Sequence, residues 1–229
     1  MRPEARAFDA VVFDLDGTLI DSAPAIRAIA GRFLAEQGAA PLTLDETRAF
    51  IGHGAAHFLR RALAARELPA NDAAVATHYP RFIAIYGAAP PGDNVPFGGI
   101  VETLGELERA GVAVGLCTNK PDEPTRRVLD AFGLAFAVVV TGDTLPQKKP
   151  SPKPLEAVVA GLGVTVARTL FVGDSEIDAL TARAAGCPFA LHTAGYHFAF
   201  SEAAQPDYFV ADIPSVLDIV INRGPIATI

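Results

Sequence analysis

The 229-residue sequence lacks the features that mark several large classes of protein. It has only two cysteines, Cys117 and Cys187, each beside an apolar run, so we expect buried thiols in a reducing compartment and no disulfide framework. No block of lysine and arginine appears, and the formal net charge is −7, which disfavours a nucleic-acid-binding surface. No uncharged apolar stretch reaches the ~18 residues of a membrane span. Acidic residues interrupt the amino-terminal stretch, where a signal peptide would need an apolar run. These absences predict a cytoplasmic protein that binds neither nucleic acid nor membrane.

What the sequence does contain is enough apolar material for a substantial core. Half of the residues are hydrophobic and only 20% are charged. A chain of this length can hold one sizeable domain, or one domain with a smaller insert.

Two carboxylates close the first apolar run. Residues 11–13 are β-branched or aromatic, and the run is too short for a helix, so it predicts a buried strand. Because side chains alternate along a strand, Asp14 and Asp16 leave it on the same side, where they repel each other unless a cation or a proton lies between them. Gly17 allows the backbone to turn sharply beside a ligand. An Asp-x-Asp-Gly run alone fits an ordinary polar turn equally well, so its interpretation depends on the rest of the chain.

Helical patterns dominate the segment after this run. Gly52, His53 and Gly54 break the pattern once, and a connection rich in proline and glycine follows it at residues 90–96. We therefore expect an all-helical cap domain over residues 21–91, hinged at both ends, and a catalytic core domain formed by residues 1–20 and 92–229. The helices expected in the cap cover residues 26–34, 43–50 (with Thr43 and Glu46 as a capping box), 55–66 and 72–86.

From residue 97 onward, apolar strands alternate with amphipathic helices. This alternation predicts an α/β fold with a doubly wound parallel sheet covered by helices on both faces. The expected strands cover residues 112–117, 136–140, 169–172, 188–192 and 208–210, and the expected helices cover residues 101–109, 121–132, 154–162, 174–185 and 216–221.

Polar residues that suit a phosphate site follow three of these strands. Because the carboxyl ends of parallel strands lie along one edge of the sheet, these loops should meet Asp14 and Asp16 there. Several acids around one point require a hard divalent cation, and Mg²⁺ with oxygen ligands is the natural choice. The neighbouring donors would bind phosphate oxygens. The further residues expected at this edge are Thr118, Asn119, Lys149, Asp174 and Asp178.

Taken in order, these runs resemble the four motifs of the haloacid dehalogenase superfamily of aspartyl-phosphate phosphohydrolases. Each motif is weak alone, but the ordered set is specific and covers nearly the whole chain, including a helical insert after the first motif. The resemblance implies a Rossmann-like core and a phosphatase activity. The motifs are Asp14-Leu-Asp16-Gly17-Thr18, Thr118-Asn119, Lys149-Pro150, and Gly173-Asp174-Ser175 with Asp178.

The resemblance also implies roles for the acidic residues. Asp14 would attack phosphorus and form an aspartyl-phosphate, and Asp16 would protonate the leaving alkoxide and then act as general base for water. Mg²⁺ would be held by Asp14, by the backbone carbonyl of Asp16 and by Asp174. Asp178 lies one helical turn beyond Asp174, so we expect it to orient the metal site or a lysine.

The resemblance implies roles for the hydrogen-bond donors as well. Thr118 and Asn119 would bind the oxygens of the transferring phosphoryl group, and Lys149 would neutralise their developing charge. Lys149 is preferred over Lys148 because it directly precedes Pro150, as in the family motif.

The substrate is predicted from the helical insert. Residues 51–63 resemble the cap of phosphoglycolate phosphatases, as do the Thr118-Asn119-Lys120 run and the Gly186-Cys187-Pro188 turn. In that family the loop that corresponds to Gly52-His53-Gly54 closes over the active site, and a small cap suits a small substrate, so 2-phosphoglycolate is the predicted one. Its carboxylate needs a cation or donor, for which His53, Arg60 and Arg61 are the candidates. The two arginines fit a solvated helix face equally well.

Three other histidines receive weaker interpretations. His57 lies four residues after His53, a spacing that occurs in zinc sites, but no third ligand is near in the sequence. His192 and His197 follow the last core strands and are expected to be loop or edge residues.

Other functions stay open at this stage. A phosphosugar phosphatase or mutase of the same superfamily would share the chemistry, whereas a metal-free dehalogenase is disfavoured because it would not use Asp16. A receiver domain also phosphorylates an aspartate beside Mg²⁺, but as a binding switch; receivers are about half this length and lack the insert. A dinucleotide-binding fold is disfavoured because no Gly-x-Gly-x-x-Gly follows the first strand. We expect a small anionic phosphomonoester as the partner and a monomer or a homodimer.

Overall fold

The core of the protein is a six-stranded parallel sheet with the order β5-β4-β1-β6-β7-β8. The computed structural model describes residues 6–196 and 200–222. From β1 the chain passes outward through β4 and β5, and then returns to β6 on the other side of β1, so the strand order reverses there. In open α/β sheets, ligands bind at the carboxyl ends of the strands beside such a reversal. The strands are β1 (Ala10–Phe13), β4 (Ala113–Cys117), β5 (Val138–Val140), β6 (Thr169–Gly173), β7 (Phe189–His192) and β8 (Tyr208–Val210).

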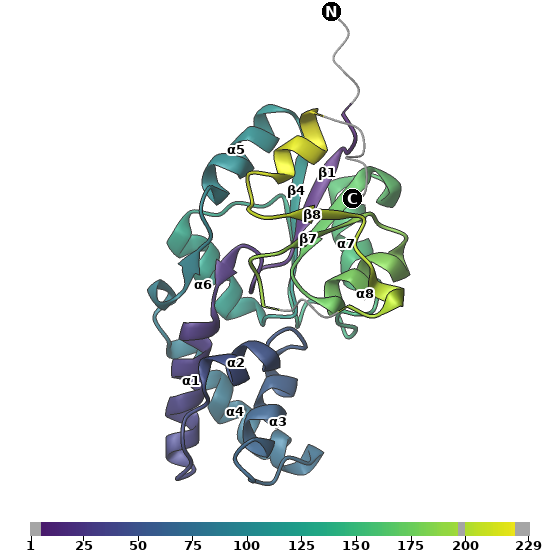
Figure 1. Cartoon of the computed structure of the whole chain (residues 1–229). Coiled ribbons are helices and arrows are strands. Elements are labelled where there is room, and N and C mark those ends of the chain that lie inside the picture. The colour runs from purple at the N-terminus through teal and green to yellow at the C-terminus, as the bar shows by residue number, and fades with distance from the viewer. Residues whose placement is uncertain (1–5, 197–199, 223–229) are drawn as a thin grey trace, which may run out of the picture.

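Helices cover both faces of this sheet, which confirms the doubly wound α/β prediction (Figure 1). Val11 and Phe13 point to one face, where they pack in a cluster with α5 (Ile100–Arg109), α6 (Asp122–Phe132) and the last helical turn (Asp218–Asn222). Val12 points to the other face. It packs there with α7 (Lys153–Leu162) and α8 (Glu176–Ala185). The alternation along β1 thus builds two apolar layers.

Four helices form a separate layer, drawn at the bottom of Figure 1. They share an apolar cluster of their own, in which Phe33, Phe58 and Phe82 are buried. The expected capping box is present, since Thr43 Oγ1 accepts a hydrogen bond from the Glu46 amide at 3.1 Å and Glu46 Oε2 accepts one from the Thr43 amide at 2.7 Å. The helices are α1 (Ala23–Glu36), α2 (Leu44–Phe50), α3 (Ala55–Ala64) and α4 (Asp72–Ala88).

The two connections to this helical layer differ from the irregular linkers expected. Ile20–Asp21 (β2) and Val95–Pro96 (β3) pair as a short antiparallel ribbon, so the two chain crossings run side by side. A single 3₁₀ turn at Pro91–Asp93 precedes β3. Two-residue strands are too short to show an alternating pattern, which is why the sequence does not predict them. No helix among the described residues combines the length and the apolar character that a membrane span needs.

Candidate active site

The carboxyl end of β1 carries a buried nucleophile candidate. Asp14 is 6% exposed, and its Oδ1 lies 2.8 Å from Lys149 Nζ. Burial raises the pKa of Asp14 to about 7; the Lys149 ammonium opposes this shift, whereas the charges of Asp178 and Asp16 add to it. The surroundings of Asp14 therefore favour a proton or a cation that neutralises its carboxylate.

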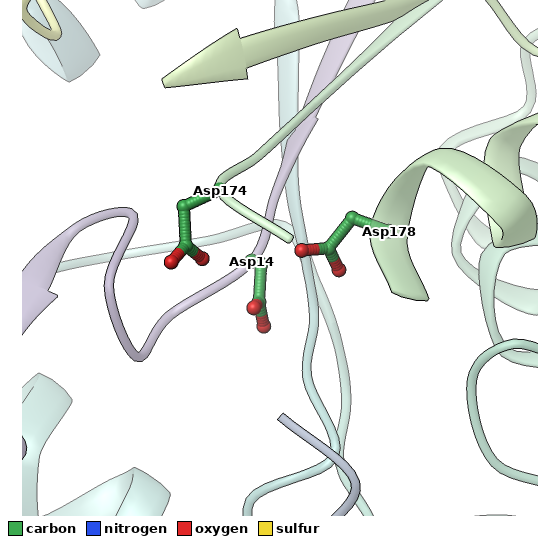
Figure 2. A group of neighbouring side chains, drawn as sticks. All are labelled: Asp14, Asp174 and Asp178. Atoms are coloured by element: carbon green, nitrogen blue, oxygen red, sulfur yellow. The ribbon is translucent and has the colours of Figure 1, made fainter. Parts of the chain in front are cut away.

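Three aspartates from different elements meet at this point. Asp14 follows β1, Asp174 follows β6, and Asp178 lies in the first turn of α8; Figure 2 shows the carboxylates of Asp174 and Asp178 on either side of Asp14. Each offers an oxygen within 4.8 Å of the others. Burial, with the nearby charges of Asp178 and Asp14, raises the pKa of Asp174 well above its ordinary value. The single ammonium of Lys149 does not balance three buried acids, and hard oxygen donors in this number suit a divalent cation.

Asp174 is held in a loop by two hydrogen bonds. Its Oδ1 accepts from Thr18 Oγ1 at 3.1 Å, and its Oδ2 accepts from the Tyr196 amide at 2.8 Å. The helix predicted from residue 174 instead begins at Glu176, because Ser175 caps it. The neighbouring turn must approach closely: a Cβ on Gly17, whose φ is +85°, would lie 2.2 Å from Asp174 Oδ2. A glycine is therefore required at position 17.

Asp178 is fully used in positioning other groups. Its Oδ2 accepts from Ser175 Oγ at 2.6 Å and from the Ser175 amide at 3.2 Å, which closes a capping box at the start of α8. Its Oδ1 lies 2.6 Å from Lys149 Nζ, and Lys149 also donates to the Cys117 carbonyl at 2.9 Å. Lys149 is thus clamped between Asp14 and Asp178, an arrangement that agrees with a role of Asp178 in orienting this lysine.

Asp16 has a partner that the sequence did not predict. Lys120 Nζ lies 2.7 Å from Asp16 Oδ1 and 5.2 Å from the centre of the Tyr86 ring, which belongs to α4. The Lys120 side chain is 2% exposed, and a nearby carboxylate is what makes such burial of a cation tolerable. The only sequence signal for this contact was the lysine in the Thr118-Asn119-Lys120 run.

The polar residues after β4 divide into two kinds. Thr118 is buried beside the site, and its hydroxyl oxygen accepts from the Lys120 amide at 3.2 Å. The side chain of Asn119, by contrast, is spent on backbone groups: Nδ2 donates to Gly52 O at 2.9 Å and to Lys149 O at 3.0 Å, and Oδ1 accepts from the Lys149 amide at 3.0 Å. The predicted phosphoryl contact of Asn119 therefore does not use its side-chain amide in this structure. That amide ties the Lys149 loop to the Gly52 loop.

A cavity of about 40 Å³ lies between the sheet edge and the helical layer. Asp14 and Asp16 line it from the core, and Gly52, Phe58 and Phe82 are among the residues that line it from the helical layer.

The three cationic candidates of the helical layer are not among the described residues that line this cavity. Arg61 is exposed, with its guanidinium 4.6 Å from the centre of the Phe50 ring. Arg60 donates to Asp72 Oδ1 at 2.6 Å. His53 is also exposed, and its ring centre lies 4.5 Å from that of His57. The structure thus brings Gly52 to the site but does not bring His53 or Arg61 there.

His192 also differs from the expectation of a loop or edge residue. It is buried at the end of β7, where its Nδ1 lies 3.2 Å from the Gly17 carbonyl oxygen and its ring packs edge-on against Phe97. It therefore supports the turn beside Asp174. His197 lies outside the described residues.

Comparisons with known proteins agree with this geometry. A phosphoglycolate phosphatase of Cereibacter sphaeroides is 47% identical over 191 residues, which covers 82% of this chain and 87% of that protein. A phosphoglycolate phosphatase of Agrobacterium fabrum is 35% identical over 222 residues, with 94% and 95% covered. A crystal structure described as a predicted phosphoglycolate phosphatase from Haemophilus somnus superposes with a TM-score of 0.85 at 29% identity, with 93% of this chain and 98% of that one covered.

The family model for haloacid dehalogenase-like hydrolases matches residues 8–186. That range contains all the motif residues from Asp14 to Asp178, which are the residues that meet at the sheet edge. These findings confirm the resemblance that the ordered motifs predict, and with it a hydrolase similar to phosphoglycolate phosphatases. The chain belongs to the haloacid dehalogenase-like hydrolase family.

Proposed function

We propose that the protein is a Mg²⁺-dependent phosphatase that hydrolyses a small phosphomonoester, 2-phosphoglycolate, through an aspartyl-phosphate on Asp14. One observation carries the proposal: the buried carboxylate of Asp14, at the carboxyl end of β1, contacts a clamped lysine and lies between the carboxylates of Asp174 and Asp178 (Figure 2). The names of the similar proteins support the choice of substrate.

The residues fit a divalent cation. Asp14, Asp16, Asp174 and Asp178 face two buried lysines, Lys120 and Lys149, so the fully ionised group carries a net charge of −2. Asp14, Asp174 and the Asp16 carbonyl would hold the ion. When bound, Mg²⁺ supplies charge neutralisation for phosphoryl transfer.

The side chains supply the remaining chemistry. Asp14 attacks phosphorus, and the bond from phosphorus to the leaving oxygen breaks as Asp16 gives that oxygen its proton. Asp16 then takes a proton from water, whose oxygen attacks phosphorus and releases phosphate with Asp14 restored. Lys149, held by Asp178 and the Cys117 carbonyl, neutralises the charge on the phosphoryl oxygens. The Thr118 hydroxyl binds one of these oxygens.

Residues 21–91 act as a cap domain on a core of residues 1–20 and 92–229. Their separate apolar cluster and the β2–β3 ribbon at the junction support this division. The cap excludes water from the cavity and limits the size of the substrate. The Asn119 side chain, which bonds the Gly52 carbonyl, holds the cap loop near the nucleophile. A cytoplasmic location and a monomeric or homodimeric state stay predictions.

The test is phosphate release with Mg²⁺ over a panel of substrates. The panel contains 2-phosphoglycolate, several phosphosugars, a nucleoside monophosphate and p-nitrophenyl phosphate, each with and without a chelator. We expect many turnovers, dependence on the metal, and a kcat/KM for 2-phosphoglycolate well above the others. A clear preference for a phosphosugar would show that the substrate is a phosphosugar and not 2-phosphoglycolate. A single stoichiometric phosphorylation without turnover would show that the protein is a phosphorylated switch and not a phosphatase.

A further inference from the structure

The cavity contains one cation that the proposed mechanism does not use. Ile51, Phe58 and Phe82 give it apolar walls on the cap side. Among the described residues that line it, Lys120 carries the only positive charge. A substrate carboxylate enclosed here would lose its water and would need a charged partner.

Lys120 is placed to be that partner. Its Nζ pairs with Asp16, which leaves β1 on the same side as Asp14 and lines the same cavity. An ammonium group has three donors, so one carboxylate does not exhaust it. Tyr86 from the cap is a further partner of the ammonium, with its ring centre 5.2 Å from Nζ and a side-chain hydrogen bond to it, which leaves one donor. The cation is therefore fixed at the border between the catalytic pair and the cap.

The two charged groups of 2-phosphoglycolate lie close enough together for one cavity to hold both. In 2-phosphoglycolate only three covalent bonds separate phosphorus from the carboxyl carbon. When the phosphoryl group lies at Asp14, its carboxylate must therefore lie close by, within the cavity and not at the exposed face that carries His53 and Arg61.

We propose that Lys120 recognises the carboxylate of the substrate and so determines the preference for a carboxylated phosphomonoester. This inference rests on the proposed phosphatase function. It assigns to the core a contact that the sequence had assigned to the cap.

The test compares two substrates that differ only at the recognised group. Ethyl phosphate keeps the phosphate ester and the CH₂ of 2-phosphoglycolate and replaces its carboxylate with a methyl group. In Lys120→Met, which keeps the length of the side chain, both rates can fall because Asp16 loses its partner. We expect the ratio of the two kcat/KM values to fall by about 10- to 100-fold, chiefly through KM for 2-phosphoglycolate, as for the loss of a charged hydrogen bond.

Arg61→Met is the matched control, because it removes an exposed cation of the cap that does not line the cavity. Its ratio should stay within about twofold of the native one, as expected for an exposed group. If Lys120→Met does not fold, as judged by circular dichroism, Lys120→Gln is measured in the same way.

The outcomes separate the two proposals. A native protein that does not hydrolyse 2-phosphoglycolate overturns the proposed function. A native preference that survives in the Lys120 variant, with both rates lowered equally, shows that Lys120 only supports Asp16 and overturns the inference alone. If Arg61→Met instead loses the preference for 2-phosphoglycolate over ethyl phosphate, the carboxylate is recognised by the cap and the inference is overturned.

Discussion

The two sides of the cavity differ in what they contribute. The sheet edge supplies charged groups, most of them buried: Lys149 pairs with Asp14 and Asp178, Lys120 pairs with Asp16, and Asp174 accepts hydrogen bonds from Thr18 and Tyr196. The cap supplies mainly apolar walls, including Phe58 and Phe82. Under the proposed function, the core performs the reaction, and the cap acts through size and exclusion of water.

The Asn119 side chain joins the two sides. Its hydrogen bonds to Gly52 O and to the Lys149 backbone connect the cap loop with the loop that carries the catalytic lysine. The positions of cap and catalytic lysine are therefore coupled by one amide. If core and cap divide their work in this way, changes to the core carboxylates should affect rate, changes to Lys120 should affect the preference for a carboxylate, and changes to the cap walls should affect the preference for substrate size.

The largest effect is expected for Asp14→Asn. The amide is nearly isosteric but a poor nucleophile, so phosphate release should fall by ~10⁴-fold or more while the fold persists. Asp9→Asn is the control at the other end of the same strand, where Asp9 pairs with Arg168 far from the cavity. It should leave the rate unchanged. Near-native activity of Asp14→Asn would show that Asp14 is not the nucleophile.

Asp16→Asn should slow hydrolysis of 2-phosphoglycolate by ~10²- to 10⁴-fold, the usual range for loss of general acid–base catalysis. With p-nitrophenyl phosphate, whose leaving group needs no proton, the loss in the first chemical step should be much smaller. Equal losses in that step for both substrates, measured by rapid mixing, would contradict the acid role.

Gly17→Ala should weaken Mg²⁺ binding by ~10- to 100-fold, because the added methyl group would displace the Asp174 carboxylate. Gly133→Ala is matched to it: Gly133 also has a positive φ, of +64°, but a Cβ there meets nothing within 4 Å. The control should cost only the ~1–2 kcal/mol of left-handed backbone strain and leave metal binding intact. Isothermal titration measures the Mg²⁺ affinity of both variants. Similar affinities would contradict the close approach of the Gly17 turn to the Asp174 carboxylate.

Metal binding should depend steeply on pH. Burial raises the pKa of Asp14 from its ordinary value of 3.8 to about 7, so between these values the folded, metal-free protein holds more protons than the unfolded chain. Its stability therefore falls as pH rises through this window, and Mg²⁺, which requires the ionised carboxylates, restores it. The apparent Kd for Mg²⁺ should fall by about tenfold per pH unit below pH 7 for each proton released. A thermal shift by Mg²⁺ that is as large at pH 5 as at pH 7.5 would contradict this.

The smallest effect is expected in the cap. Phe58→Leu removes part of an apolar wall without touching a charge. We expect kcat/KM for 2-phosphoglycolate to fall by about three- to tenfold, and larger phosphomonoesters to gain relative to it. The rate with p-nitrophenyl phosphate should change least. A loss of the size seen with Asp16→Asn on every substrate would show that the cap takes part in the chemistry.

The sequence predicts those parts of the molecule that depend on local patterns. The strand before Asp14, the capping box at Thr43 and the alternation that builds the parallel sheet are all readable within a few residues of each position. The order of the motifs further predicts that four residues meet at the sheet edge: Asp14, Lys149, Asp174 and Asp178.

The remaining features join residues that are distant in the sequence. Lys120 and Asp16 are 104 positions apart, and their pairing has no local signal. The contact of the Tyr196 amide with Asp174 and the burial of His192 against Gly17 depend in the same way on how loops meet in space. The sequence left the cap cations as candidates for a related reason: helical periodicity gives a face, but not which face closes a cavity.

The most direct test of the central claim is to trap the phosphorylated aspartate. In Asp16→Asn with Mg²⁺ and p-nitrophenyl phosphate, phosphorylation should proceed while release by water is slow, so the intermediate accumulates. Borohydride then reduces an acyl phosphate to an alcohol, and peptide mass spectrometry locates it. The account predicts homoserine at position 14, only when substrate is present and never when Asp14→Asn is added to the variant. Steady turnover of the native protein, with reduction at another residue or at none, would contradict it.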